Sequence, residues 1–521
     1  MYKSLFAALR ESAGRFPQKT ALIYQGQSYS YHKLLKDILR MAALLQMGGV
    51  KRGDRVVVCC GNRPEAVLAF WAVLATGATV AVISPEQSPA KIRFILADSQ
   101  ATAFVVESAL LDKLTADLAA LEDLRSILLV DEAGQREALL GNQVLGLCDD
   151  VAAIEYSPAP TISEDLAALI YTSGSTGKPK GVMMSHANML CALASLNEYL
   201  GHRPDDVFLN VLPLSFDYGL YQSIMAFSVG ATLVLEHDMV LPLQTMKQIA
   251  RYRCTIVPGV PVFFELLQQF SRFAHFDFSC VRSVTNTGAA LLPKHIAIIK
   301  TLFPHAAIFS MYGLTECKRC TYLPPHLIDE KPASVGIAIP NTEIMVVDEE
   351  DLPCPPYQVG QLVVRGGTVM QGYWRRPEET ARKIRPHPVT GGRCLYTGDY
   401  GYLDEDGCYY FRGRMDEVIK VRGRKLIPRE IEDVLRQFKG VEEASVICTA
   451  SENGDYQIVA FLECADGKLD EAALRTECRR SLEQFQMPHL FRFMERLPRN
   501  QNGKIDKPIL QQEYLRDLQL S

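Results

Sequence analysis

The chain has 521 residues, of which 48% are hydrophobic and 22% are charged, and its formal net charge is −5. This length exceeds what one hydrophobic core usually supports, so we expect at least two domains. The sequence contains no dense run of Lys or Arg and no segment as long as a membrane span, which argues against nucleic acid as a partner and against a membrane-crossing helix. The 14 cysteines are scattered without a framework, and we interpret them as free thiols of a cytoplasmic protein.

Helical and strand patterns alternate along the first half of the chain. The sequence predicts an amphipathic helix near the amino terminus, further helices at residues 31–45, 64–74 and 244–251, and strands at 55–60, 79–83, 231–236 and 254–257. Helices that alternate with apolar strands imply parallel sheets covered by helices.

The pattern changes after about residue 340. Short strands and tight turns at 342–348 and 360–365 predict a β-rich subdomain at about 340–413. A new strand, helix and strand follow at 418–421, 429–438 and 444–448. We therefore expect an α/β fold, with a large N-terminal domain over residues 1–413 and a small C-terminal α+β domain over 414–521.

A phosphate-binding loop is predicted at residues 171–181, Y-T-S-G-S-T-G-K-P-K-G, directly after the apolar run 166–170. Its glycines let backbone N–H groups approach an anion closely. Further donors and positive charge come from Thr172, Ser173, Ser175, Thr176, Lys178 and Lys180. The P-loop of kinase-type NTPases is excluded, because Thr172 replaces its first glycine and Pro179 its magnesium-binding hydroxyl. The ordered ending after a buried strand also disfavours a flexible linker.

This loop resembles the phosphate-binding signature of the AMP-forming adenylating enzymes, which include acyl-CoA synthetases, adenylation domains and luciferases. Seven further segments extend the resemblance, in order, over essentially the whole chain: N-T-G-A-A at 286–290, M-Y-G-L-T-E at 311–316, Q-G-Y-W at 371–374, Y-T-G-D at 396–399, G-R-M-D at 413–416, K-V-R-G at 420–423 and N-G-K-I-D at 502–506. The resemblance implies that a carboxylate attacks the α-phosphate of ATP, that pyrophosphate leaves, and that the thiol of CoA or of carrier-protein phosphopantetheine then displaces AMP.

The resemblance also implies which residues bind the nucleotide: Thr172, Ser173, Gly174, Ser175, Thr176, Gly177, Lys178, Gly288, Ala289, Tyr312, Asp399 and Arg414. Tyr312 would lie against adenine, and Asp399 would accept hydrogen bonds from the ribose hydroxyls. Thr315 would contact the α-phosphate and Glu316 would bind Mg²⁺, a hard cation that prefers oxygen ligands. Thr287 stands where many relatives have a second glycine, a mild departure from the pattern.

Lys504 matches the family's lysine that bridges the carboxylate and the α-phosphate during adenylation. Since it lies in the C-terminal domain, the resemblance implies a mobile lid that closes for adenylation and then rotates about Asp416. Gly423 would then line the tunnel for the thiol. The pair Arg424-Lys425 departs from the residues of many relatives, and it suits either a phosphorylated thiol such as CoA or a solvated loop.

The acid is expected to contact Phe216, Asp217, Tyr218, Gly288 and Ala290. Phe216-Asp217 is similar to a segment of amino-acid-activating domains in which an aspartate faces the substrate ammonium. A buried carboxylate without a cationic partner is costly, so a substrate that carries the cation would explain Asp217. Fatty-acyl relatives also have an aspartate in this segment, where it can bond a backbone turn. The alternatives therefore stay open: a stand-alone enzyme that loads an amino acid onto a carrier protein, or a ligase joining a fatty or other acyl acid to CoA or a carrier.

Other interpretations of the chain are weaker. An inactive adenylate-binding module would be expected to lose Lys504, Glu316 or Asp399, and all three are present. Adenylation followed by oxygenation or amide formation stays possible, but Gly423 and the complete hinge favour thiol chemistry. His186 follows Ser185, which is expected to cap a helix, so the histidine is assigned a structural place in its first turn.

Overall fold

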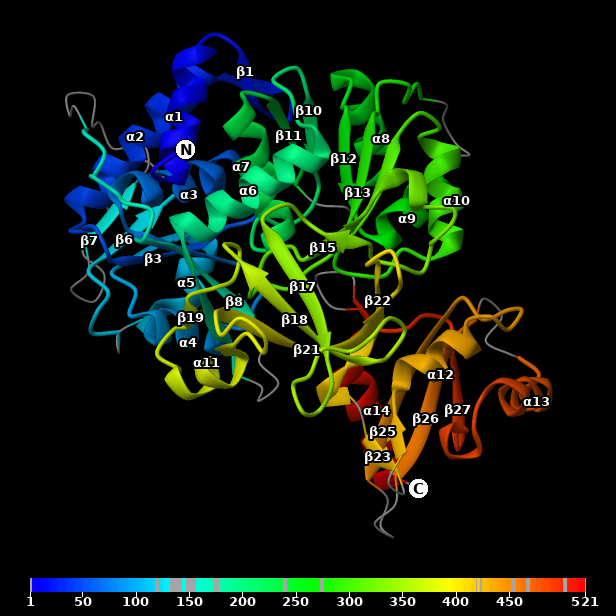
Figure 1. Cartoon of the computed structure of the whole chain (residues 1–521). Helices are drawn as coiled ribbons and strands as arrows, with labels where there is room; N and C mark the ends of the chain where they lie inside the picture. Colours follow the sequence, from blue (N-terminus) through cyan, green and yellow to red (C-terminus); the bar gives the residue numbers. More distant parts are fainter. Residues whose placement is uncertain are drawn as a thin grey trace. The chain divides into compact units, whose positions relative to one another are not determined.

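The computed structural model of the chain describes residues 2–118, 121–131, 143–146, 156–172, 178–237, 241–271, 276–417, 419–421, 424–450, 456–464, 469–499 and 504–520. The chain forms two compact units. The first comprises Met1–Ile344 and Val364–Leu395, and the second comprises Met345–Val363 and Tyr396–Ser521. Figure 1 labels the helices and strands of both units.

One sheet of the first unit has the strand order β19-β9-β8-β4-β3-β5-β6-β7. Its strands are β3 (Arg55–Cys59), β4 (Thr79–Ile83), β5 (Ala103–Val106), β6 (Ser126–Leu129), β7 (Gln143–Gly146), β8 (Leu166–Thr172), β9 (Lys180–Ser185) and β19 (Gly372–Tyr373). Strands β3 to β7 pair in parallel and β4 is parallel to β8, whereas β9 runs antiparallel to both β8 and β19. The interior parallel strands are almost continuously apolar, as expected when both faces of a sheet are covered.

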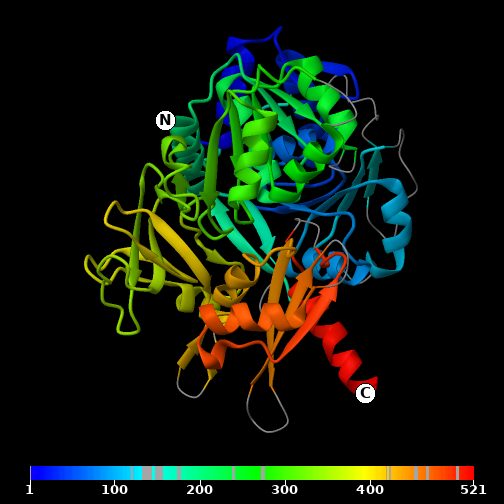
Figure 2. The same ribbon diagram turned by 90° about the vertical axis from the view of Figure 1, so that its right-hand side faces the viewer.

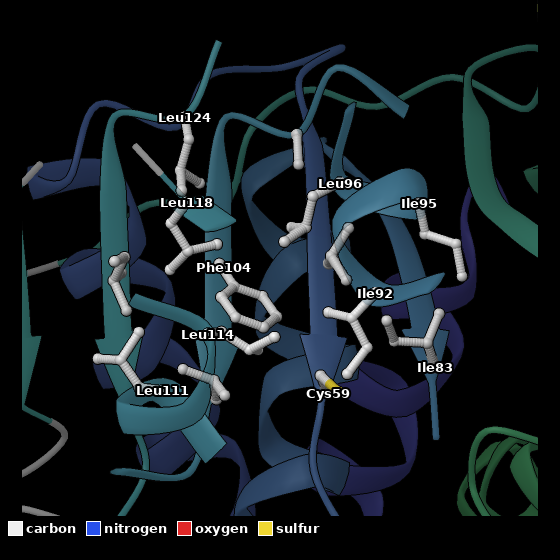
Figure 3. Close-up of a cluster of buried hydrophobic side chains, with 14 of the residues drawn as sticks. Cys59, Ile83, Ile92, Ile95, Leu96, Phe104, Leu111, Leu114, Leu118 and Leu124 are labelled. Carbon is white, nitrogen blue, oxygen red and sulfur yellow. The ribbon is translucent and has the colours of Figure 1, made fainter. Parts of the chain in front are cut away.

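Helices α4 (Pro89–Ser99) and α5 (Ser108–Leu118) cover one face of this sheet. Figure 3 shows the apolar cluster between them and the strands, with Phe104 of β5 next to Leu114 of α5 and Ile83 of β4 next to Ile92 of α4. Helix α3 (Pro64–Thr76) is buried along its whole length except at Glu65. A helix that is apolar on every side is expected to lie inside the protein, and α3 does.

The second sheet of this unit has the order β16-β15-β14-β13-β12-β10-β11-β1-β2. Its strands are β1 (Thr20–Tyr24), β2 (Gln27–Ser30), β10 (Val207–Asn210), β11 (Thr232–Leu235), β12 (Ile256–Gly259), β13 (Ser283–Asn286), β14 (Ala307–Tyr312), β15 (Thr321–Leu323) and β16 (Ile337–Ala338). The run from β14 to β1 is parallel, and the strands at both ends are antiparallel. Helices α8 (Pro242–Tyr252), α9 (Pro261–Ser271) and α10 (Pro293–Leu302) lie beside β12 and β13 (Figure 1).

The remaining helices of the first unit are α1 (Leu5–Arg15), α2 (Tyr31–Met47), α6 (His186–Leu200), α7 (Asp217–Val229), α11 (Pro377–Lys383) and the 3₁₀ turn η1 (Pro325–Leu327). A separate five-stranded sheet has the order β17-β18-β21-β20, with β22 paired to β21. Its strands are β17 (Thr342–Val347), β18 (Gly360–Gly366), β20 (Ile384–Pro386), β21 (Arg393–Leu403) and β22 (Tyr409–Arg414).

The carboxyl-terminal part of the second unit is an α+β sandwich. A sheet of β25 (Glu443–Ala450), β26 (Tyr456–Glu463) and β27 (Leu490–Met494) packs α12 (Pro428–Leu435) and α13 (Glu471–Ser481) against one face (Figures 1 and 2). Alternate residues of β25 and β26, such as Ile447 and Val459, point to the other face of the sheet. There they pack in one cluster with Leu510 of α14 (Lys507–Leu520). The hairpin β23 (Ile419–Val421) and β24 (Arg424–Leu426) and the turns η2 (Met415–Glu417) and η3 (Gln484–Gln486) complete the unit.

The predicted α/β fold, with helix-covered parallel sheets, a β-rich part and a small α+β part, is confirmed. Several element boundaries differ by a few residues from the sequence-based expectation, and two of these differences have a visible cause. The strand expected at 254–257 begins at Ile256, because the backbone N–H of Cys254 still bonds the end of α8 at Ile249. The helix expected at 429–438 ends at Leu435 in i to i+3 turns. Among the described residues, no helix is long and apolar enough to cross a membrane.

Candidate functional site

The hairpin of β8 and β9 carries the predicted phosphate loop. Strand β8 ends at Thr172, which pairs with Lys180 at the start of β9. Lys178 is exposed just before β9. Ser173, Gly174, Ser175, Thr176 and Gly177 lie outside the described residues. The loop is thus joined on both sides to paired strands, as the buried run before it predicted.

Tyr373 links the predicted metal-binding carboxylate to this hairpin. Its hydroxyl donates to Oε1 of Glu316 over 2.7 Å, and its backbone pairs with Val182 of β9. The ammonium of Lys180 lies 5.6 Å from the centre of the Tyr373 ring and forms an ion pair with Glu379. The residues that flank the phosphate loop and the carboxylate of Glu316 are therefore brought together by one tyrosine, to which the sequence analysis assigned no role although it identified the Q-G-Y-W segment.

The chemistry of Glu316 fits Mg²⁺ that arrives with a nucleotide. Mg²⁺ is commonly held by one or two carboxylates together with phosphate oxygens and water. Glu316 is half-buried, and its backbone oxygen accepts from Met370 N–H over 2.7 Å, so hydrogen bonds hold both its backbone and its carboxylate. Within the described residues no group of three or more His, Cys, Asp or Glu side chains could hold a metal ion by itself. A single carboxylate beside the predicted phosphate loop is compatible with Mg²⁺ that is bound to ATP.

The ends of β13 and β14 place the residues expected beside the nucleoside. These strands are parallel neighbours, with Asn286 opposite Ser310, so the segments that follow them emerge at the same edge of the sheet. Gly288 has φ +86°, a left-handed conformation that favours glycine. Tyr312 ends β14 and is half-buried. Ala289 is half-buried and Ala290 is exposed, and Thr315 follows in a half-buried position.

The expectation that Asp217 lacks a cationic partner is wrong. Asp217 begins α7, and Nζ of Lys318 lies 3.1 Å from its Oδ2 and 2.8 Å from its backbone oxygen. The side chains of Lys318 and Asp217 are 1% and 10% exposed. Burial lowers the pKa of Lys318 to about 7, although the charge of Asp217 acts in the opposite direction. The protein itself therefore supplies the cation for which a substrate ammonium was invoked.

The residues on either side of Asp217 have different surroundings. Tyr218 is buried, and its hydroxyl bonds the backbone oxygen of Thr285 in β13 over 2.8 Å. Burial raises its pKa to about 12, so it stays neutral. Phe216 is half-buried and its ring meets that of Tyr218 edge to face, at 6.2 Å between centres. Tyr218 therefore connects the start of α7 to β13, at Thr285, three residues before Gly288.

Lys318 and Arg319 are functional candidates that the sequence analysis did not identify. They come two and three residues after Glu316, and both are buried, with Arg319 3% exposed. The signal in the sequence was the pair of adjacent cations between Cys317 and Cys320. Those two cysteines are also buried, with 2.9 Å between their sulfur atoms.

The predicted residues of the second unit are Asp399, Arg414, Asp416, Gly423 and Lys504. Asp399 is buried in β21 and pairs with Arg414 in β22. The guanidinium of Arg414 donates to both carboxylate oxygens of Asp416, at 2.9 and 3.2 Å, and both side chains are exposed. Asp416 lies in the turn η2, and Lys504 is exposed before α14. Gly423 lies outside the described residues.

The structural assignment of His186 is confirmed. Ser185 caps α6, where its hydroxyl accepts from Asn188 N–H in a capping box. His186 is buried, and its Nδ1 accepts from the backbone N–H of Leu5. Burial lowers the pKa of His186 to about 4, so the ring is neutral near pH 7.

Comparison with known proteins gives concordant matches. Residues 9–374 match the AMP-binding enzyme family, and residues 430–504 match the AMP-binding enzyme C-terminal domain. The chain is 30% identical to the long-chain-fatty-acid–CoA ligase of Bacillus subtilis (strain 168), over 96% of this chain and 93% of that protein. It is 28% identical to tyrocidine synthase 2 of Brevibacillus parabrevis, over 97% of this chain and 14% of that protein. The ATP-bound structure of MatB from Rhodopseudomonas palustris superimposes with a TM-score of 0.86 at 28% identity, over 99% of both chains. With the AMP-binding match alone spanning well over half of its length, the chain belongs to the AMP-binding enzyme family and is an AMP-forming ligase.

Proposed function

We propose that this ligase joins a carboxylic acid to the thiol of a phosphopantetheine arm in two steps. In the first step the carboxylate oxygen attacks the α-phosphorus of ATP, and pyrophosphate leaves. In the second step the thiol sulfur attacks the acyl carbon, the acyl–O bond to AMP breaks, and the thiol gives up its proton. Family membership already gives ATP-dependent acyl-CoA ligase or adenylation activity.

The observation that carries the proposal is the link made by Tyr373 between Glu316 and β9. It supports a triphosphate lying along the loop between Thr172 and Lys180, with Glu316 holding the Mg²⁺ that screens its charge. Both reactants of the first step are anions, so neutralisation and positioning supply most of the catalysis. We assign Thr315 to the α-phosphate and Tyr312 to the adenine.

The second unit supplies the remaining proposed roles. Asp399 would bind the ribose, and Arg414 would reach the ribose or a phosphate. Lys504 would bridge the acid and the α-phosphate in the first step. We place the boundary between the N-terminal domain and the lid at residues 413 and 414, with the hinge at Asp416 and the thiol tunnel at Gly423. The bidentate pair of Arg414 and Asp416 supports this hinge, because a lid movement at η2 would have to break or carry that pair.

The acceptor is proposed as the chemistry common to CoA and carrier proteins, a phosphopantetheine thiol. One relative named above is a CoA ligase matched over nearly its full length, and another, tyrocidine synthase 2, is matched over a small part of a longer chain. An amino acid as the substrate no longer follows from Asp217 alone, because Lys318 is already its partner.

Exchange of labelled pyrophosphate into ATP tests the first step. The purified chain should catalyse exchange only when a suitable acid and Mg²⁺ are present. Adding CoA, or a carrier protein that bears phosphopantetheine, should convert the same acid to a thioester with release of AMP, and the two acceptors are compared in parallel. Exchange without thioester formation from either acceptor would contradict the proposal of a thiol ligase.

A further inference from the structure

A buried cluster of three charged side chains lies next to the proposed acid site. Lys318 and Arg319 are on the loop between β14 and β15, shortly after Glu316, and Asp217 is the first residue of α7. Of the two cations, only Lys318 contacts the carboxylate of Asp217, and the Lys318 and Arg319 residues are 1% and 3% exposed. Neither step of the proposed reaction assigns a role to Lys318 or Arg319.

The two cations differ in how well they are satisfied. Lys318 donates to Asp217 twice, and its ammonium lies 3.9 Å from the centre of the Tyr221 ring. Arg319 lies over the Tyr218 ring, 4.9 Å from its centre, and donates only a long hydrogen bond of 3.4 Å to the backbone oxygen of Lys318. Its Nε is buried without a hydrogen-bond partner, and in the described part of the chain no carboxylate pairs with it.

Burial of such an arginine lowers the stability of the protein unless an anion or other hydrogen-bond acceptor pairs with it. Guanidinium carries five N–H donors and stays charged, and an unpaired buried charge costs several kcal/mol. The hydroxyl of Tyr221 is likewise buried without a partner. Two unsatisfied groups that can donate hydrogen bonds, one of them cationic, therefore belong to the same cluster.

The cluster adjoins the parts of the fold that the acid is expected to contact. Tyr218, under the Arg319 guanidinium, bonds β13 at Thr285, three residues before Gly288. The loop that carries Lys318 and Arg319 turns back on itself at Gly313, where a Cβ would lie 2.5 Å from the backbone oxygen of Lys318. The cations are thus held between the start of α7 and the ends of β13 and β14.

We propose that the acid activated by this enzyme carries a second carboxylate, and that Arg319 binds it together with the Tyr221 hydroxyl. The inference rests on the proposed function and specifies its substrate class. A carboxylate accepts two parallel hydrogen bonds from a guanidinium, which adds geometric selectivity to the charge. The second carboxylate and Asp217 balance the two cations. An unsubstituted fatty chain would leave Arg319 unpaired in an apolar environment, which disfavours it.

Pyrophosphate exchange with matched pairs of acids tests the inference. Each pair has the same carbon skeleton, with a methyl group in place of the second carboxylate: succinate with butyrate, glutarate with pentanoate, phthalate with 2-methylbenzoate, and the amino-substituted pairs aspartate with 2-aminobutyrate and glutamate with norvaline. In at least one pair, the wild-type enzyme should prefer the dicarboxylic member by roughly a hundredfold in kcat/KM, the scale of one buried charge pair. The amino-substituted pairs show whether an ammonium is accepted as well.

The variant Arg319→Gln should remove most of this preference, because kcat/KM should fall much further for the dicarboxylic member of a pair than for the monocarboxylic member. Tyr221→Phe, which deletes only a hydroxyl, should reduce the preference about tenfold and keeps the test valid if Arg319→Gln fails to fold. A wild-type enzyme that activates monocarboxylic acids as well as their dicarboxylic partners would overturn the inference and leave the ligase intact, and so would a preference unchanged in both variants. If none of the acids supports pyrophosphate exchange, that result would instead contradict the proposed function.

Discussion

The hydroxyl of Tyr373 is the contact on which the geometry of Glu316 depends most directly. It reaches the carboxylate from a two-residue strand that pairs with β9, so the two parts of the proposed Mg²⁺–triphosphate site keep a fixed relation. A partner that orients a metal ligand typically changes metal affinity or activity tenfold to a hundredfold when it is lost.

We therefore predict that Tyr373→Phe raises the Mg²⁺ concentration needed for half-maximal pyrophosphate exchange by about tenfold. Thermal unfolding should change little, because one hydrogen bond contributes about 1 kcal/mol. Tyr29→Phe, at a partly exposed tyrosine whose hydroxyl bonds Gln27, serves as the matched control. An unaltered Mg²⁺ dependence in Tyr373→Phe would show that Glu316 is not the metal ligand.

Lys318 makes a separate prediction about pH. Its pKa falls from the ordinary value of 10.5 to about 7 because the side chain is buried. Between these values the unfolded chain binds more protons at this site than the folded chain does, so the contribution of Lys318 to stability increases as pH rises from about 7 to 10.5.

Denaturant unfolding of the wild type and of Lys318→Met at a series of pH values measures this contribution. The difference in the free energy of unfolding between the two should shift in favour of the wild type as pH rises through this range. A difference that stays constant with pH would contradict the lowered pKa of Lys318 in the folded protein.

At the scale of single residues, the sequence was informative where the function of a side chain depends on its immediate neighbours. Ser185 caps its helix as predicted, because a cap is a local interaction. Tyr373 and Lys318 could not be assigned in the same way. Their partners, Glu316 and Asp217, lie 57 and 101 residues away in sequence, and only the packing of the sheets brings them together.

The loop between β14 and β15 shows how one element combines several of these roles. It carries Thr315, Glu316, Lys318 and Arg319. At Gly313 its backbone lies against the backbone of Lys318 and Arg319. A Cβ at Gly313 would lie 2.5 Å from the backbone oxygen of Lys318 and 2.8 Å from Cα of Arg319, closer than side chains tolerate. Glycine is therefore required by the close approach of two backbone segments.

Gly313→Ala should accordingly destabilise the protein by about 1 to 3 kcal/mol, the usual cost of overpacking, and should weaken pyrophosphate exchange because Glu316 moves with the loop. Gly14→Ala is the matched control, since Gly14 lies within α1 and a Cβ there meets no atom within 4 Å. That control should be neutral or slightly stabilising. Equal stability of Gly313→Ala and the wild type, measured by urea unfolding, would be inconsistent with this packing.

Elements with strong periodicity were predicted well, and their ends less well. The strand at Thr79–Ile83 and the helix that begins at Pro64 agree with the expectation, since apolar runs and a proline at the first turn are local signals. The start of β12 moved because α8 ends in a left-handed Arg253, with φ +50°, and the next residues still cap that helix. The pairing of the two-residue strand β19 with β9 has no signal in either segment.

For the molecule as a whole, the proposed two-position lid is the claim that the sequence resemblance supports and that solution experiments must test. Asp416 is held by Arg414 in the turn that begins the lid. The division of the chain at residue 413 stays a prediction. The small C-terminal domain was predicted because a new strand, helix and strand pattern begins after residue 413, and such a pattern is visible in the linear sequence alone.

A proline at the proposed hinge should separate the two steps. Asp416→Pro restricts φ and removes the ion pair with Arg414, so we expect it to hold the lid in the adenylating position. Pyrophosphate exchange should then persist while thioester formation falls by roughly a hundredfold, the loss expected when reacting groups are not brought together. Asp406→Pro, in the turn between β21 and β22, is a control for general disruption of the second unit. Parent rates for both steps would exclude Asp416 as the pivot.

The measurement that tests the central claim most directly is a comparison of the two half-reactions in Lys504→Ala. The account predicts that formation of acyl-adenylate from acid and ATP falls by roughly a hundredfold or more, the effect of removing one preorganised electrostatic contact. Formation of the thioester from a supplied acyl-adenylate and CoA or phosphopantetheine should stay near the wild-type rate. Comparable losses in both half-reactions, or no loss in the first, would contradict an AMP-forming acid–thiol ligase whose lid brings Lys504 to the phosphate only for adenylation.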